Sequence, residues 1–96
     1  MVKLSLLKKL WPKENLSHLN DTTGVSIDSR RVEKGDVFFA VHGELHDGHD
    51  FIEDALAKGA ALIIAEEGYR ERFSHSLPSI YVKDSLAAFS YLAHLH

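Results

Sequence analysis

Cysteine is absent from this 96-residue sequence, which excludes disulfides, thiolate metal sites and cysteine nucleophiles. Long apolar runs are also absent, since no stretch approaches the roughly 20 residues of a membrane-spanning helix. The first ten residues carry three lysines and lack a small-residue cleavage site, so they do not resemble a signal peptide. We therefore expect a cytoplasmic protein that does not interact with membranes.

Positive charge is scarce. The chain has 11 Lys+Arg against 14 Asp+Glu, and its only adjacent basic pairs are Lys8-Lys9 and Arg30-Arg31. A nucleic-acid-binding domain normally carries a basic stripe or a positive balance. The sequence therefore predicts no nucleic-acid partner.

The length supports one hydrophobic core, and 45% apolar residues are ordinary for a globular chain. We expect a single domain over residues 1–96. Residues 1–23 form its N-terminal helix and a connection, and residues 24–96 form its core.

Helical spacing of apolar residues alternates with continuous apolar runs. Leucines at helical spacing predict a helix over residues 2–11 that Pro12 ends. The runs VFFAV (37–41) and AALIIA (60–65) are typical of strands covered on both faces. Between them, a helix is predicted from Phe51 to a C-cap glycine, Gly59. The other predicted elements are strands over 24–27 and 78–82, a short helix over 69–73, and a helix over 85–96 capped by Asp84.

These elements predict the α/β class, as a small three-layer domain with flanking helices. Its sheet is expected to be mostly parallel, with about four strands, because strands alternate with helices.

The predicted last helix is apolar on two sides. At roughly 100° per residue, Leu86, Phe89 and Ala93 share one face. The opposite face carries Ala88, Tyr91 and Leu95. Two interpretations stay open: one face is partly exposed, or the chain is cut from a larger protein whose next domain covers it. In the second case we expect weak self-association through residues 85–96.

The loop GELHDGHD (43–50) spaces two glycines as a phosphate-binding P-loop does. A P-loop then needs Lys and Ser/Thr, where this chain has His49 and Asp50. Acidic residues within the loop would also repel a triphosphate, which excludes nucleotide hydrolysis here. Two interpretations remain: the backbone amides of residues 47–51 bind an anion or a hydroxyl-rich ligand, or Asp47 or Asp50 simply caps the following helix.

Seven histidines raise the question of a metal site, above all His42, His46 and His49. These three lie on a glycine-containing loop without an acidic ligand at a standard spacing. His94 and His96 fall on different sides of a helix. Surface histidines explain the pattern better, so no metal ligand is predicted.

Asp28, Ser29 and Arg30 directly follow the first predicted strand. The carboxyl end of a strand in an α/β sheet is where ligands usually bind. The Ser29 hydroxyl can donate and accept a hydrogen bond, and Arg30 can pair with Asp28, Asp36 or a ligand phosphate. The alternative is a purely structural turn. A serine hydrolase is not indicated, because no Gly-x-Ser-x-Gly elbow is present.

Taken together, four segments resemble the N-terminal domain of the Mur ligases, the ATP-dependent amide ligases of peptidoglycan precursor synthesis. They are GVSIDSR (24–30), KGDVFFAV (34–41), GELHDGHDF (43–51) and ALAKGA (55–60). The resemblance covers roughly residues 24–96, and the ordered series is more specific than any single segment.

Within the family, VKD (82–84) followed by Ala88, Phe89, Leu92 and Ala93 resembles most the MurF type, which adds D-Ala-D-Ala to a UDP-MurNAc-tripeptide. The compact N-terminal segment and Ser29 are equally compatible with the MurE type, which adds the third peptide residue. The MurF type is preferred.

The resemblance implies that this domain holds the UDP end of a UDP-MurNAc-peptide. It implies substrate contacts from Ile27, Ser29, Glu44, Leu45 and His46. The side chains of residues 44–46 depart from those of other family members, so these three residues are expected to contact the substrate through backbone atoms. The supporting residues are Asp28, Arg30, Gly43, Asp47, Gly48 and His49.

The family's ATP site, its magnesium ligands and its modified lysine belong to a central domain that these residues do not include. We therefore expect no catalytic residue and no cofactor in this chain, with ATP and Mg²⁺ used by the implied full-length ligase. The expected partners are the UDP-MurNAc-peptide and the ligase's central and C-terminal domains. Two alternatives from other classes are a free-standing α/β interaction module and a small enzyme that uses His46 or His49 as acid and base.

Overall fold

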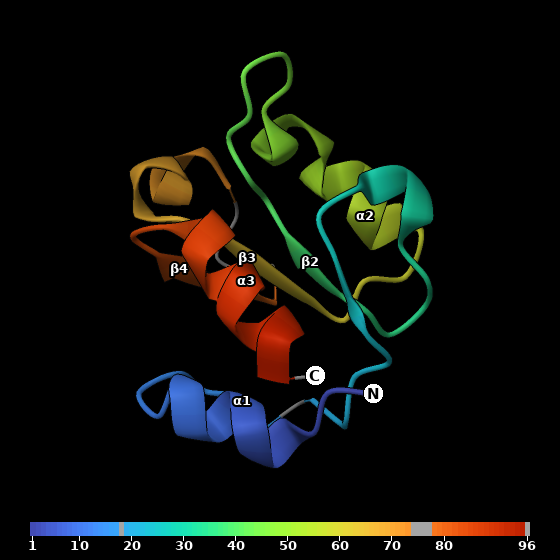
Figure 1. Cartoon of the computed structure of the whole chain (residues 1–96), viewed down its shortest axis with the longest axis vertical. Helices are drawn as coiled ribbons and strands as arrows, with labels where there is room; N and C mark the ends of the chain where they lie inside the picture. Colours follow the sequence, from blue (N-terminus) through green and yellow to red (C-terminus); the bar gives the residue numbers. More distant parts are fainter. Residues whose placement is uncertain (18, 74–77, 96) are drawn as a thin grey trace.

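The structure, a computed structural model, describes residues 1–17, 19–73 and 78–95. Its described strands form one parallel sheet in the order β1-β2-β3-β4 (Figure 1). The strands are β1 (Val25–Ser26), β2 (Val37–Phe39), β3 (Leu62–Glu66) and β4 (Ser79–Val82). The helices are α1 (Leu4–Leu10), α2 (Ile52–Ala57) and α3 (Ser85–Leu95), with short 3₁₀ helices η1 (Ser29–Arg31), η2 (Gly48–Phe51) and η3 (Glu67–Arg72). The predicted α/β class is confirmed, and every described strand pair is parallel.

Helices cover both faces of the sheet because successive strand side chains point to opposite sides. Phe39 packs on one face in a cluster that includes Leu7 of α1 and Leu92 of α3. Phe38 packs on the other face with Ile52 of α2. All three residues of β2 are buried, which explains its continuous apolar sequence. The molecule therefore has the predicted three layers.

Gly59 ends α2 as predicted. Its φ of +99° lies in the left-handed region that glycine enters without strain. The amide of Ala60 then donates to the Ala55 carbonyl at 3.0 Å, which closes the end of the helix. Chain reversal at Gly59 leads directly into β3.

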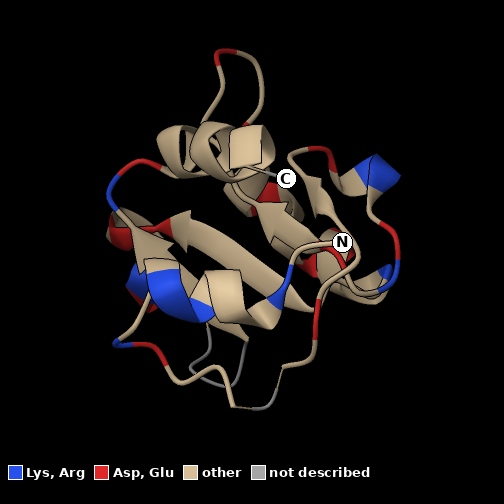
Figure 2. Cartoon of the chain, turned by 60° about the horizontal axis from the view of Figure 1, so that its bottom comes forward, with Lys and Arg blue, Asp and Glu red and all other residues tan. Residues whose placement is uncertain are grey.

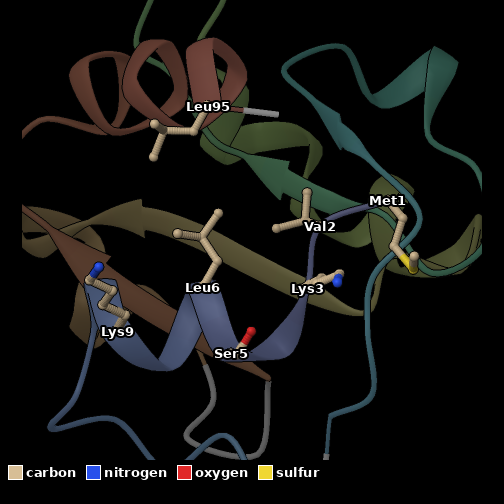
Figure 3. A pocket seen from close by; sticks show the side chains of 7 residues that line it. All are labelled: Met1, Val2, Lys3, Ser5, Leu6, Lys9 and Leu95. Atoms are coloured by element: carbon tan, nitrogen blue, oxygen red, sulfur yellow. The ribbon is translucent and has the colours of Figure 1, made fainter.

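The N-terminal segment shares the core of the sheet. Val2 pairs with Thr22 through two backbone hydrogen bonds of 2.8 Å, and Leu7 is fully buried. A cavity of about 430 Å³ lies between α1 and the end of α3. Leu6 and Leu95 extend into it from the two helices (Figure 3). Lys and Arg of the described chain are spread over α1 and several connections (Figure 2).

The last helix leaves apolar side chains exposed, as one interpretation expected, but neither predicted face coincides with the stripe that meets the sheet. Ser85 and Leu92 are buried and Ala88 and Phe89 are half-buried, so the sheet-facing stripe follows these four positions. Phe89 packs edge-on against Phe39, with ring centroids 5.4 Å apart. The large apolar side chains that this helix exposes are Leu86, Tyr91 and Leu95, between 48% and 55% exposed. The Asp84 cap is confirmed, because its carboxylate accepts the Ala87 amide at 3.0 Å. The predicted helix end at His96 lies outside the described residues.

Candidate functional site

The connections that follow β1 and β2 meet at the carboxyl edge of the sheet and enclose a cavity of about 640 Å³. This is the edge at which parallel sheets usually bind ligands, and the volume lies within the range typical of small-molecule sites. Seven of the predicted site residues line this site cavity: Ile27, Asp28, Ser29, Arg30, Gly43, His46 and Gly48. The structure therefore brings together two segments that lie about 15 residues apart in the sequence.

The wall that follows β1 is held by its own side chains. Asp28 caps η1 by accepting the Arg30 amide at 3.0 Å, and its carboxylate also accepts two hydrogen bonds from the Arg30 guanidinium. Arg30 thereby lowers the pKa of Asp28 to about 2. Ser29 is 6% exposed at the base of the turn. Of the two carboxylates that the sequence offered Arg30, the structure selects Asp28.

The wall that follows β2 is a hairpin over residues 42–47. His42 and Asp47 pair as an antiparallel bridge, and the Gly43 amide donates to the His46 carbonyl at 2.9 Å. Glu44 and Leu45 form the exposed tip and do not line the cavity; Leu45 is 89% exposed. In Figure 1 this hairpin projects beyond the sheet.

Asp47 caps η2, as one of the two interpretations of this loop expected. Its carboxylate accepts the His49 amide at 2.9 Å, and its carbonyl accepts the Asp50 amide at 3.0 Å. Gly48 donates its amide to Val41, and a Cβ at Gly48 would lie 2.7 Å from the Val41 nitrogen. With these amides engaged and no lysine at the loop, the residues do not fit a triphosphate.

The prediction of surface histidines was wrong for His49, which is 1% exposed. Its Nδ1 lies 2.7 Å from the Asp47 carboxylate, and its Nε2 accepts the Glu66 amide at 3.0 Å. The Tyr69 ring stacks on the imidazole, with centroids 3.5 Å apart and planes 6° apart. The Tyr69 hydroxyl also donates to Asp47.

Opposing effects set the pKa of Asp47. Burial raises this pKa, but hydrogen bonds from Tyr69 and His49 together outweigh it and bring the pKa to about 2. The hydrogen bond that Tyr69 donates to Asp47 is also the main reason why the pKa of Tyr69 is raised. At neutral pH the Asp47 carboxylate is therefore ionised and the Tyr69 phenol is neutral.

Sequence reasoning missed four residues that line the cavity: Phe38, Val41, Phe51 and Asp54. Phe51 is 37% exposed and meets the His46 ring edge-on, with centroids 6.3 Å apart. A signal for Phe51 was available, because a large aromatic directly follows the capped turn. Asp47 and His49 were predicted as supporting residues and lie behind the cavity wall.

Among the described residues, no group of three or more His, Asp or Glu side chains is placed to hold a metal ion. No described helix is long and apolar enough to cross a membrane.

A four-stranded parallel sheet with helices on both faces, and a cavity built from its first two connections, defines a three-layer α/β domain. The model of the Mur ligase family, catalytic domain, matches residues 21–93. The chain belongs to the Mur ligase family.

Its curated relatives include UDP-N-acetylmuramoyl-L-alanyl-D-glutamate--2,6-diaminopimelate ligases. The protein of this name from Geobacillus kaustophilus is 44% identical over 76% of this chain and 14% of its own length. That from Bacillus velezensis is 39% identical over 97% of this chain and 18% of its own length. The chain thus spans less than a fifth of these relatives.

Similar solved structures are MurF ligases. The Thermotoga maritima enzyme in complex with ADP has a TM-score of 0.64 at 39% identity, over 77% of this chain and 16% of that one. A MurF structure from Acinetobacter baumannii has a TM-score of 0.68 at 25% identity, over 91% of this chain and 19% of that one. The predicted family is confirmed. The preference for the MurF type is not confirmed, because the named sequence relatives are diaminopimelate ligases.

Proposed function

We propose that this domain binds the UDP end of a UDP-MurNAc-peptide in the site cavity, as the first domain of a peptidoglycan-precursor ligase. The observation that carries the proposal is the cavity itself. It joins the two connections that contain the family-like segments GVSIDSR and GELHDGHDF.

The chemistry of the cavity suits a nucleoside. Phe51 and Ile27, which are 37% and 43% exposed, supply apolar and aromatic surface against which a pyrimidine ring can pack. The Ser29 hydroxyl and the backbone around Gly43 supply hydrogen-bonding groups for the base and ribose.

The charge of the cavity is less favourable to a free triphosphate. Its lining includes the carboxylates of Asp28 and Asp54 and one guanidinium, that of Arg30, which Asp28 already engages. Arg30 is 85% exposed, so it can reach a diphosphate at the rim without leaving Asp28. We therefore assign the nucleoside to the interior and the diphosphate to the mouth.

In such a ligase the domain acts by anchorage. Binding energy gained at the UDP end positions a carboxylate that reacts elsewhere, in domains that carry the ATP site. We expect the residues of this chain to supply no step of that reaction.

For the particular ligase we favour the MurE type, because the relatives at 39–44% identity over most of this chain are named as 2,6-diaminopimelate ligases. The MurF type stays the second candidate, supported by the Thermotoga maritima structure at 39% identity. The two substrates share the UDP end, so we expect this domain to bind UDP-MurNAc-dipeptide and UDP-MurNAc-tripeptide with equal affinity.

Isothermal titration calorimetry of the 96-residue chain with UDP, and with each UDP-MurNAc-peptide, tests the proposal. We expect weak binding. Ser29→Ala should weaken it by roughly fivefold, the effect of one neutral hydrogen bond of about 1 kcal/mol. Ser90→Ala, which removes an exposed hydroxyl from α3, is the matched control and should change nothing. Absence of heat at millimolar ligand would refute UDP binding, and equal affinity of the two variants would make Ser29 a turn residue only.

A further inference from the structure

The wall of the site cavity that follows β2 is tied to the next segment of the sheet at two points. The Glu66 amide, at the end of β3, donates to His49 Nε2 at 3.0 Å. The Tyr69 hydroxyl, on η3, donates to the Asp47 carboxylate. Both links cross between elements, over 17 and 22 residues of chain.

The hydrogen bonds of His49 define its tautomer. A backbone amide can only donate, so Nε2 must present its lone pair to Glu66 and the proton must lie on Nδ1. Nδ1 then donates to Asp47, whose carboxylate also accepts the Tyr69 hydroxyl. Every polar atom of the imidazole is thus engaged within the chain.

The cluster lies directly behind the cavity wall. Asp47 ends the hairpin and caps η2, so its position fixes the residues on either side of it. Those neighbours, His46 and Gly48, line the cavity, whereas Asp47 and His49 do not. Any displacement of Asp47 therefore changes the shape of the cavity without removing a group that contacts its contents.

We infer that Asp47, His49 and Tyr69 are positioning residues for the site cavity, which hold the hairpin over residues 42–47 in its ligand-competent place. A buried imidazole is an expensive way to fill a core, because each polar atom must be satisfied. The burial of His49 is explained by its hydrogen bonds to Asp47 and to the Glu66 amide, which set the distance between the hairpin and β3. This assignment deepens the UDP-binding proposal and rests on it.

The free chain tests the link to the hairpin without any ligand. Tyr69→Phe keeps the ring stacked on His49 and removes only the hydroxyl that reaches Asp47. We expect amide hydrogen exchange at Gly43 and Gly48 to become roughly five- to tenfold faster, the loss of one hydrogen bond. The Ala88 amide of α3, bonded to Asp84, should be unchanged. Tyr91→Phe, on an exposed face of α3, is the matched control.

Two substitutions of His49 separate its two hydrogen bonds. His49→Gln places a carbonyl where Nε2 accepts the Glu66 amide, whereas His49→Asn reaches only Asp47. If the link to β3 positions the hairpin, the glutamine variant keeps its Glu66 amide protected and its UDP affinity within about threefold of wild type. In the asparagine variant we expect the Glu66 amide to exchange roughly tenfold faster and UDP to bind roughly tenfold more weakly. Equal behaviour of the two variants would contradict the assignment.

UDP titration of the same variants completes the test. Weaker UDP binding by Tyr69→Phe, with Tyr91→Phe equal to wild type, supports the inference. If exchange in the hairpin becomes faster but UDP affinity is unchanged, the cluster does not position the hairpin for binding and the inference is contradicted. If exchange in the hairpin is unchanged, the cluster does not hold the hairpin and the inference is overturned. If the wild-type chain binds no UDP, the proposed function fails, while exchange at Gly43 and Gly48 still decides whether the cluster holds the hairpin.

Discussion

Replacement of Gly48 by alanine should be among the most damaging small substitutions in this chain. A Cβ at this position would lie 2.7 Å from the Val41 nitrogen, 3.1 Å from the Val41 oxygen and 3.2 Å from the Ala40 Cα. All three atoms belong to backbone that runs on from β2, so no flexible side chain can move aside. The first turn of η2 must instead shift away from the sheet.

The cost follows from two effects. Overpacking of this kind typically costs about 1–3 kcal/mol. The shift also breaks or lengthens the 2.9 Å hydrogen bond from the Gly48 amide to Val41, which contributes about 1 kcal/mol. The sum is about 2–4 kcal/mol of unfolding free energy. For a chain of this size that corresponds to a fall in Tm of roughly 10–25 °C.

Thermal and urea unfolding, followed by circular dichroism, measure this directly. Gly68→Ala is the matched control, because a Cβ at Gly68 meets nothing within 4 Å and its φ is not positive. Its stability should stay within about 0.5 kcal/mol of wild type. Equal stability of the two alanine variants would refute the steric argument. Gly48→Ala should also weaken UDP binding, since Gly48 lines the cavity.

Three further predictions concern acid, chemistry and association. Asp47 has a pKa of about 2 in the folded chain against 3.8 unperturbed, so its stabilisation is complete above pH 4 and is lost as pH falls through 2. We expect this loss to reach roughly 1 kcal/mol after solvent screening, and to be absent from urea titrations of Asp47→Asn. The chain should release no phosphate from ATP with Mg²⁺ and substrates over hours; turnover that survives repurification and disappears on His49→Ala would contradict this. Because Tyr91 and Leu95 are about half exposed, sedimentation at hundreds of micromolar should detect weak self-association, and a strict monomer would argue against it.

Features encoded by neighbouring residues could be read from the sequence. The Gly59 helix end and the Asp84 cap depend on contacts within a few residues, which spacing and residue type reveal. The strands could be read for another reason, because burial on both faces leaves a continuous apolar run in the sequence. The meeting of the two connections was also predictable in outline, because the carboxyl ends of parallel strands share one edge.

Features that depend on distant contacts could not be read in the same way. The burial of His49 is set by the Glu66 amide and the Tyr69 ring, which nothing near His49 in sequence announces. Helical spacing identified the apolar positions on α3, but it did not show which face of the helix meets the sheet. That choice is made by contacts such as Phe89 with Phe39, which join segments 50 residues apart.

The glycines of residues 43–48 show why spacing alone is a weak guide to function. A P-loop needs its glycines so that free amides can surround phosphate oxygens. Here a Cβ at Gly43 would lie 2.9 Å from the His46 carbonyl, and one at Gly48 would meet the backbone of Ala40 and Val41. The same spacing therefore serves a closed hairpin whose amides bond to the chain itself. What separates the two cases is the next residue: a lysine would extend toward phosphate, whereas His49 turns inward and ties the loop to β3.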